Sequence, residues 1–246
     1  MNYKYYNDST QNFEDFASGK VIYHKTGMPC FPVRLAGEIF KRSLEYVDKK
    51  SDITLYDPCC GGGYMITALG FLNPDIMGAI YASDVDEEAV ILAKENLSLL
   101  TKQGLMKRKM QIENMLEKYG KQSHKEALES VQKFLEVIGK RTFEPIIKCF
   151  VNDALNPDSL RHKNFTADII IADVPYGNLV SWSENDKNPV DVLLDTLIPV
   201  LSNSSIVAII TDKAQKIKNE KYKRLERFKA GKRVVEICKI CMGTLL

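Results

Sequence analysis

Apolar, strand-like runs alternate with helix-like segments along almost the whole of this 246-residue chain. The runs begin near residues 53, 79, 146, 168, 205 and 234. A chain in which strands alternate with helices favours a mostly parallel sheet with helices on both faces. We therefore predict a doubly wound, Rossmann-like α/β fold. The last run, 234–240, is expected in an antiparallel hairpin at the edge of the sheet.

Four of these runs are closed by an aspartate. Asp57, Asp84 and Asp173 stand at the ends of their runs, and Asp153 follows its run by three residues. The carboxyl ends of parallel strands meet at one edge, which is where open α/β sheets bind ligands. We therefore expect the four carboxylates to lie together in a binding site.

The turn after Asp57 is rich in glycine and reads DPCCGGG over 57–63. Gly61 and Gly63 can take a positive φ and allow a ligand to approach the backbone closely. A nicotinamide-dinucleotide fingerprint would need a third glycine where Ile66 stands. The spacing is typical of the turn around the methionine part of S-adenosylmethionine in methyltransferases of this fold. We assign Asp57, Cys59, Gly61 and Gly63 to that cofactor.

Asp84 stands 27 positions after Asp57, where an acidic side chain can accept both ribose hydroxyls. Asp86 fits the N-cap of a helix over 87–100. Asp153 is a candidate partner for the adenine amino group, and it fits equally well as a cap of the turn at 156–158.

The sequence DVPYG at 173–177 combines a carboxylate, a rigid turn and an aromatic ring. Asp173 can accept a hydrogen bond from the exocyclic amino group of a base, which we expect to be the methyl acceptor. The carbonyl before or at Pro175 can accept a second hydrogen bond, and Tyr176 can stack on the ring. The alternative is an ordinary turn after a strand. Trp182 either closes over the base or covers an edge of the core.

Positive charge is concentrated in two segments, although the net charge is only +2. Residues 102–141 hold 10 Lys or Arg against 5 Glu, and 213–233 hold 10 against 2. This asymmetry favours an RNA partner, although solvated basic faces remain an equal alternative for 102–141. Because 213–233 follows a strand, we expect it to leave the sheet at the edge with the aspartates. The predicted phosphate contacts are Lys221, Lys223, Arg224, Arg227, Lys232 and Arg233.

Length and composition fit a single domain over 1–246, since 45% of the residues are hydrophobic. Within residues 1–50 we expect a mobile N-terminal arm followed by a helix. Residues 102–141 are expected to form a helical insertion of two charged helices broken near Gly120. Arg34, on the first helix, is a candidate contact to RNA or cofactor, or a salt-bridge partner.

We expect a cytoplasmic monomer that holds no metal and does not enter a membrane. No apolar run approaches 18 residues, and the first residues lack a signal-peptide pattern. Six cysteines fit a reducing compartment. Cys238 and Cys241 look like half a zinc site without a second pair, and the three histidines show no ligand spacing.

Taken together, these motifs resemble the AviRa family of ribosomal RNA methyltransferases. The likeness covers nearly the whole chain, and the chain departs from the family pattern at Gly62, at Val174 and after Cys238. The matching segments are FPVRLA at 31–36, EIF at 38–40, DPCCG at 57–61, ASDVD at 82–86, NL at 96–97, DVPYG at 173–177, TD at 211–212 and LER at 225–227.

The resemblance implies methylation of a guanine base in large-subunit ribosomal RNA with S-adenosylmethionine, and with it resistance to orthosomycin antibiotics such as avilamycin. Three alternatives share part of the pattern. A DNA amino-methyltransferase usually needs a separate target-recognition domain, for which the chain has no room. A small-molecule methyltransferase leaves the basic segments unexplained, and a non-catalytic RNA-binding domain has no need for Asp84 and Asp173.

Overall fold

In a computed structural model of the protein, the described residues are 3–8, 10–28, 30–174, 188–213, 215, 217–241 and 243–244. The strands are β1 (Ile53–Asp57), β2 (Met77–Asp84), β3 (Ile146–Val151), β4 (Ile169–Asp173), β5 (Ile206–Thr211), β6 (Tyr222–Ala230) and β7 (Arg233–Ile240). The α-helices are α1 (Val33–Glu45), α2 (Tyr64–Leu72), α3 (Glu87–Ser98), α4 (Lys102–Tyr119), α5 (Gln122–Gly139) and α6 (Pro189–Leu197). Two short 3₁₀ helices are η1 (Glu14–Phe16) and η2 (Ile198–Val200).

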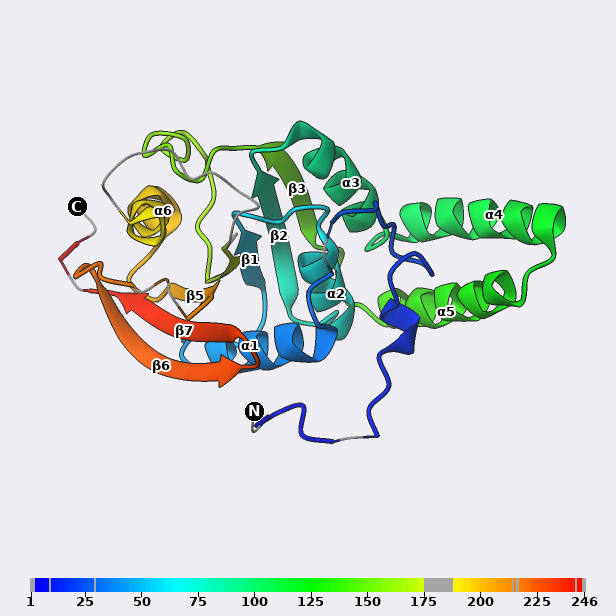
Figure 1. The fold of residues 1–246 in the computed structure, drawn as a ribbon, viewed down its shortest axis with the longest axis horizontal. Coiled ribbons are helices and arrows are strands. Elements are labelled where there is room, and N and C mark those ends of the chain that lie inside the picture. Colours follow the sequence, from blue (N-terminus) through cyan, green and yellow to red (C-terminus); the bar gives the residue numbers. More distant parts are fainter. Residues whose placement is uncertain are drawn as a thin grey trace.

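The described strands form one seven-stranded sheet in the order β3-β2-β1-β4-β5-β7-β6 (Figure 1). β1 to β5 run parallel, whereas β7 is antiparallel to both β5 and β6. The predicted α/β fold with an antiparallel hairpin at its edge is confirmed. Because the strand order reverses between β1 and β4, the carboxyl ends of these two strands flank the crevice in which such sheets bind ligands.

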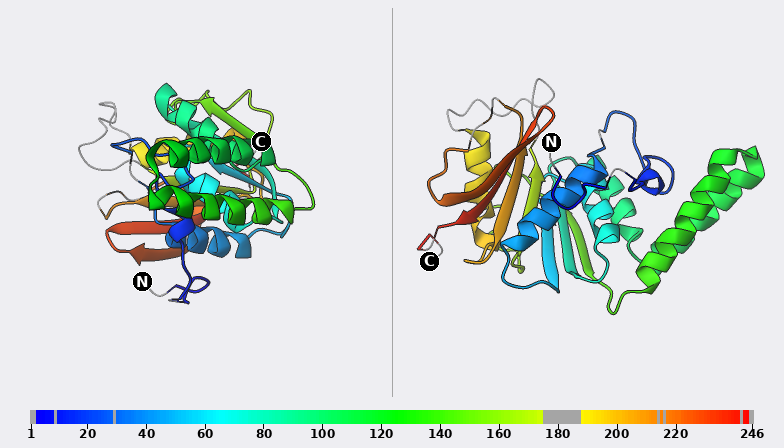
Figure 2. Two further views of the ribbon diagram at one scale, coloured as in Figure 1. Left: turned by 90° about the vertical axis from the view of Figure 1, so that its right-hand side faces the viewer. Right: turned by 90° about the horizontal axis from the view of Figure 1, so that it is seen from below.

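Helices cover both faces of the sheet (Figure 2). Ile169 and Ile171 of β4 join the core beneath α1, α2 and α3, whereas Ile170 and Ala172 face the core beneath α6. A strand whose successive side chains enter two cores is apolar throughout, which is why β4 appears in the sequence as an unbroken apolar run.

Helix ends match their sequence signals. Asp86 caps α3 by accepting a hydrogen bond from the backbone N of Glu88 at 2.9 Å. Gly120 ends α4 with a φ of 60° and separates it from α5, as predicted.

The helices α4 and α5 project away from the sheet as an arm (Figures 1 and 2). At its base Phe134 stacks on Phe71 with ring centroids 4.2 Å apart.

The N-terminal segment packs against the body, so the expectation of a mobile arm is wrong for its described residues. Tyr6 and Phe16 are buried. Glu38 on α1 is fully buried and accepts hydrogen bonds from the backbone N atoms of Lys4, Tyr5 and Tyr6 at 2.6, 2.9 and 3.1 Å. The order of this segment cannot be predicted from side-chain periodicity, because it depends on three backbone N atoms that donate to one carboxylate.

We expect Glu38→Ala to destabilise the protein by about 2–4 kcal/mol, because it strands buried donors and removes a partner of Arg42. Chemical denaturation measures the loss, and limited proteolysis should show earlier cleavage within residues 3–20. Glu45→Ala is the matched control, because its pair with Lys4 is exposed and worth less than about 1 kcal/mol. Equal losses in the two variants would contradict the assigned role of Glu38.

Candidate active site

Asp57 ends β1 and is only 2% exposed. Its Oδ1 accepts a hydrogen bond from the backbone N of Cys59 at 3.1 Å. Burial, reinforced by the negative charges of Asp84 and Asp173, raises the pKa of Asp57 well above its usual value. A cationic group bound beside Asp57 would offset this penalty. The carboxylate therefore fits a positively charged ligand.

Asp84 joins the turn after β1 to the end of β2. The backbone N of Gly61 donates to Asp84 Oδ2 at 2.8 Å, and the backbone N of Asp86 donates to Oδ1 at 3.1 Å. The backbone N of Cys60 also donates to the carbonyl of Ser83 at 2.9 Å. Each carboxylate oxygen can accept a second hydrogen bond, so Asp84 keeps the capacity to bind two neighbouring hydroxyl groups.

The glycine turn is closed on one side and open on the other. Gly61 and Gly63 have φ values of 51° and 73°. A Cβ at Gly63 would lie 3.0 Å from Ala93 of α3, whereas a Cβ at Gly61 would meet nothing within 4 Å. The turn can therefore receive a ligand on the side of Gly61.

Asn96 of α3 holds this turn, a role that the sequence analysis missed. Its Nδ2 donates to the carbonyl of Gly62 at 2.8 Å and to that of Tyr23 at 3.1 Å. The backbone N of Tyr23 donates to Asn96 Oδ1 at 2.7 Å. The available signal was an amide among the apolar residues of the buried face of a helix.

Asp153 lies beyond β3 and is exposed. Its Oδ1 accepts a hydrogen bond from the backbone N of Leu155 at 2.9 Å, so it caps a turn at 153–155 and not the one at 156–158 that the alternative interpretation named. In that second turn the backbone N of Asp158 donates to Asn156 Oδ1 at 3.1 Å. The preceding residue, Asn152, is buried and donates its backbone N to the carbonyl of Asp84 at 2.9 Å. Asp153 thus stays near the end of β2 and remains a candidate contact to the adenine of the cofactor.

Asp173 ends β4, where burial raises its pKa to about 6 and the positive charge of Arg233 opposes the shift. Asp57 and Asp173 point to the same face of the sheet, because Leu55 is opposite Ile169 and side chains alternate along each strand. Pro175, Tyr176 and Trp182 lie outside the described residues.

The hairpin of β6 and β7 runs from one end of the parallel strands to the other, so its basic residues lie at different ends of the sheet. β6 starts with Tyr222 opposite Ile240, at the amino ends of the parallel strands, and finishes with Ala230 opposite Arg233 at their carboxyl ends. The carboxyl ends of the parallel strands, where Asp57, Asp84 and Asp173 lie, are called the aspartate edge below. The predicted placement of the basic residues at this edge is wrong for Lys221, Lys223 and Arg224. β5 ends with Thr211 at the carboxyl ends of the parallel strands, whereas β6 begins with Tyr222 at their amino ends, which the sequence pattern does not reveal.

Four of the predicted phosphate contacts form ion pairs with carboxylates, and one of them is Arg233, which lies 3.9 Å from Asp173. Lys221 lies 2.9 Å from Asp195, and Arg224 and Arg227 lie 3.1 and 3.4 Å from Glu236. Lys223 and Lys232 are exposed, and Lys232 lies in the turn between β6 and β7 at the aspartate edge.

Arg34 takes part in packing the N-terminal segment. Its guanidinium lies 5.6 Å from the ring centre of Phe13 and 5.9 Å from that of Tyr3, and NH2 donates to the carbonyl of Gln11 at 3.2 Å. These contacts give Arg34 a role within the chain that the sequence had left open.

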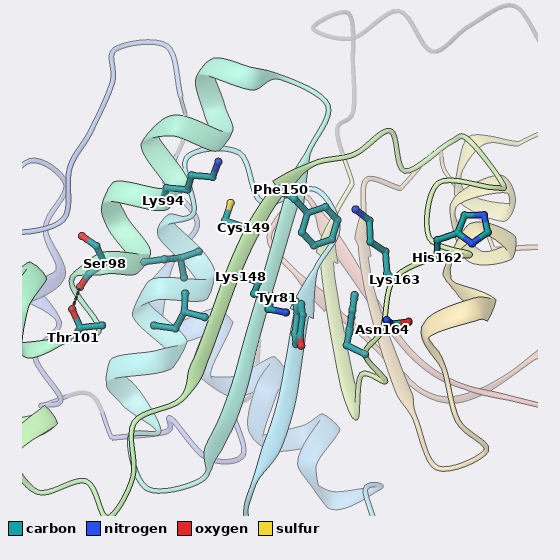
Figure 3. A pocket seen from close by; sticks show the side chains of 13 residues that line it. Tyr81, Lys94, Ser98, Thr101, Lys148, Cys149, Phe150, His162, Lys163 and Asn164 are labelled. Atoms are coloured by element: carbon teal, nitrogen blue, oxygen red, sulfur yellow. Dashed lines mark hydrogen bonds between the residues drawn. The ribbon is translucent and has the colours of Figure 1, made fainter.

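A separate hollow of about 730 Å³ lies beside the edge strand β3 (Figure 3). Lys94, Lys148, His162 and Lys163 are among its lining residues, and Lys163 Nζ lies 4.2 Å from the ring centre of Phe150. None of the four aspartates lines it. The hollow is therefore distinct from the crevice at the strand ends.

Within the described residues, no group of three or more His, Cys, Asp and Glu side chains is arranged to hold a metal ion. None of the described helices is both long and apolar enough to span a membrane.

A mixed seven-stranded sheet with a glycine turn after β1 and an acidic residue at the end of β2 defines a class I methyltransferase. A class I S-adenosylmethionine-dependent methyltransferase of Listeria monocytogenes has the same fold, with a TM-score of 0.52 and 12% identity, covering 91% of this chain and 64% of that chain.

The chain belongs to the rRNA methyltransferase AviRa family, whose model matches residues 1–233. It is 36% identical over 225 residues to the 23S rRNA (guanine(2535)-N(1))-methyltransferase of Streptomyces viridochromogenes, covering 89% of this chain and 88% of that protein. The rRNA methyltransferase AviRa structure from that organism at 1.5 Å superposes with a TM-score of 0.87 and 32% identity, covering 96% of both chains. The family predicted from the motifs is confirmed.

We expect Asp57→Asn to stabilise the ligand-free protein by about 1–3 kcal/mol at pH 8, because it removes a buried charge without changing shape. An aspartate with a raised pKa costs stability once the pH exceeds its ordinary value, and the cost grows until the pH passes the raised pKa. The gain should therefore shrink toward pH 4. Denaturant titrations at both pH values measure the gain in the free energy of unfolding. A loss of stability at pH 8 would contradict the claim that the buried charge of Asp57 is destabilising.

Proposed function

We propose that this protein transfers a methyl group from S-adenosylmethionine to N1 of a guanine in large-subunit ribosomal RNA. The name of the Streptomyces relative specifies that atom and that RNA. The observation in this chain that carries the proposal is the Asp173 carboxylate at the end of β4, whose pKa burial raises to about 6. This value suits a group that accepts a proton near neutral pH.

Guanine N1 carries a hydrogen, so its lone pair becomes available for attack only when that proton leaves. Asp173 in its ionised form is the proton acceptor in this proposal. The sequence pattern favoured an exocyclic amino group as the methyl acceptor, and the ring nitrogen replaces it here. Pro175 and Tyr176 keep their proposed roles of holding and stacking on the base, and Trp182 that of closing over it.

When bound, S-adenosylmethionine supplies an electrophilic methyl group without a metal. Asp57 fits its cationic methionine part because the carboxylate is buried beside other negative charges. Asp84 has acceptor capacity for the ribose hydroxyls, and the open side of Gly61 leaves room for the ligand. Cys59 contributes its backbone N to the position of Asp57, and Asp153 is the proposed contact to adenine.

An RNA substrate is supported by the concentration of Lys and Arg in two segments of a chain whose net charge is only +2. Exposed Lys232 at the aspartate edge is the strongest proposed phosphate contact among the hairpin residues. Family membership extends the proposal to protection of ribosomes against orthosomycins. The test is whether a host that expresses the gene grows in medium containing avilamycin.

Two glycine variants test the cofactor site separately from the fold. Gly61→Ala places a methyl group in open space, so we expect a stability loss of about 1 kcal/mol from the positive φ and a clear loss of S-adenosylmethionine affinity. Gly63→Ala adds overlap with Ala93, so we expect a loss of about 2–4 kcal/mol. Calorimetric binding and thermal unfolding distinguish the two. Unchanged S-adenosylmethionine affinity in a folded Gly61→Ala variant would show that the cofactor does not bind on the Gly61 side of the turn.

Asp173→Asn keeps the shape of the side chain and removes its ability to take a proton. We expect single-turnover methyl transfer to 23S rRNA to fall by about 10²–10⁴-fold, with cofactor and RNA affinities near those of the wild type. In the wild type, transfer should rise with pH through about 6 and then level off, because Asp173 must be ionised. Asp158→Asn, at a carboxylate that is 69% exposed, is the matched control.

The product is identified by nuclease digestion of the RNA and mass spectrometry of its nucleosides. N1-methylguanosine is the expected product. Methylation of another atom, or near-native transfer by Asp173→Asn, would contradict the proposal.

A further inference from the structure

Arg233 and Asp173 face each other at the aspartate edge without forming a hydrogen bond. Arg233 Nε lies 3.9 Å from Asp173 Oδ1. Both atoms are buried, and neither has a hydrogen-bond partner among the described residues. The side chains as a whole are 25% and 27% exposed, so the pair is reachable from outside.

The fold holds the two groups at this separation. Asp173 is opposite Ile210 of β5, and Ile210 is opposite Val235 of β7, so Arg233 lies one alternation beyond on the same face. The Arg233 guanidinium rests 5.1 Å from the ring centre of Phe31, just before α1. Arg227, by contrast, pairs with Glu236 on the strand beside it. A buried donor and acceptor that face each other unbonded are costly unless a ligand completes them.

We propose that Arg233 and Asp173 together bind the Watson–Crick edge of the target guanine, Arg233 donating to O6 and Asp173 accepting from N1. This inference rests on the proposed function and adds to it the residue that selects and activates the base. Guanine presents an acceptor, O6, beside a donor, N1–H. Adenine presents a donor, the N6 amino group, beside an acceptor, N1, so it would oppose both protein groups.

The same arrangement assists the reaction. The N1 proton passes to the Asp173 carboxylate, and the negative charge left on the base is shared with O6. The Arg233 guanidinium stabilises that charge by a charge-assisted hydrogen bond. The new bond joins N1 to the methyl carbon, while the carbon–sulfur bond of the methyl donor breaks and its electron pair stays on sulfur. Asp173 then returns its proton to water.

This role differs from the phosphate contact predicted for Arg233 from the sequence. A phosphate contact needs a guanidinium directed to solvent, whereas Nε of Arg233 is buried and faces a carboxylate. Its neighbour Lys232 is exposed and lies at the same end of the hairpin. The two adjacent cations therefore offer a matched comparison between recognition of the base and binding of the backbone.

The test compares Arg233→Gln with Lys232→Gln on RNA that carries either guanosine or 6-thioguanosine at the target position. On guanosine we expect Arg233→Gln to lower the saturating single-turnover rate by about 10²–10³-fold, with RNA and cofactor affinity nearly unchanged. Lys232→Gln should weaken RNA binding and flatten its salt dependence.

The thio base isolates the role of Arg233 at position 6. A thiocarbonyl makes N1–H more acidic and spreads the charge onto sulfur, so the reaction depends less on the guanidinium. The deficit of Arg233→Gln should therefore shrink by about tenfold or more on the thio substrate. Arg233→Lys keeps the positive charge, so it should retain more activity than Arg233→Gln, and thermal unfolding verifies that each variant folds.

Two results would overturn the inference. An equal deficit of Arg233→Gln on both bases would exclude contact with position 6, and lost RNA affinity with a normal saturating rate would return Arg233 to the phosphate backbone. Failure of the proposed function is distinguishable, because the wild type would then yield no N1-methylguanosine, whatever the behaviour of Arg233.

Discussion

The hydrogen bond from the backbone N of Gly61 to Asp84 joins the end of β1 to the end of β2, and the rest of the site is arranged around it. It fixes a turn whose own residues impose little shape, since Gly61 and Gly63 both have a positive φ. Asn96 holds the opposite side of the same turn. Cys59 in the same turn donates its backbone N to the buried Asp57 carboxylate at 3.1 Å, so the turn also holds the end of β1.

Two buried carboxylates give the site an unfavourable electrostatic environment. Asp57 and Asp173 both have raised pKa values because they are buried, and the positive charge of Arg233 opposes the shift at Asp173. A ligand that neutralises or completes these groups binds only the folded state and therefore stabilises it. On the proposed function, stability and cofactor binding oppose each other at Asp57, so a substitution that removes its charge is expected to gain stability and lose affinity for the cofactor.

The described strands other than β6, the closing aspartates, the cap at Asp86 and the break at Gly120 were predictable, because each depends on local sequence and on side-chain periodicity. The contacts of Arg34, the crossing of the edge hairpin and the pair formed by Arg233 and Asp173 were not. The contacts of Arg34 depend on how Tyr3, Gln11 and Phe13 pack against α1. The other two features depend on which strands are neighbours and on the end of the sheet at which β6 begins. No spacing within the chain encodes the fact that β7 lies between β5 and β6.

The helical arm of α4 and α5 has a consequence for how proteins of this architecture can diverge. Its two ends meet between α3 and β3, where Arg141 donates to the carbonyls of Leu100 and Gly70 at 2.6 and 3.1 Å. The arm is therefore a closed excursion from the body, anchored where it leaves and returns. Whole helical turns can be gained or lost at its far end without changing the register of any strand, so its length is free to follow the shape of a partner.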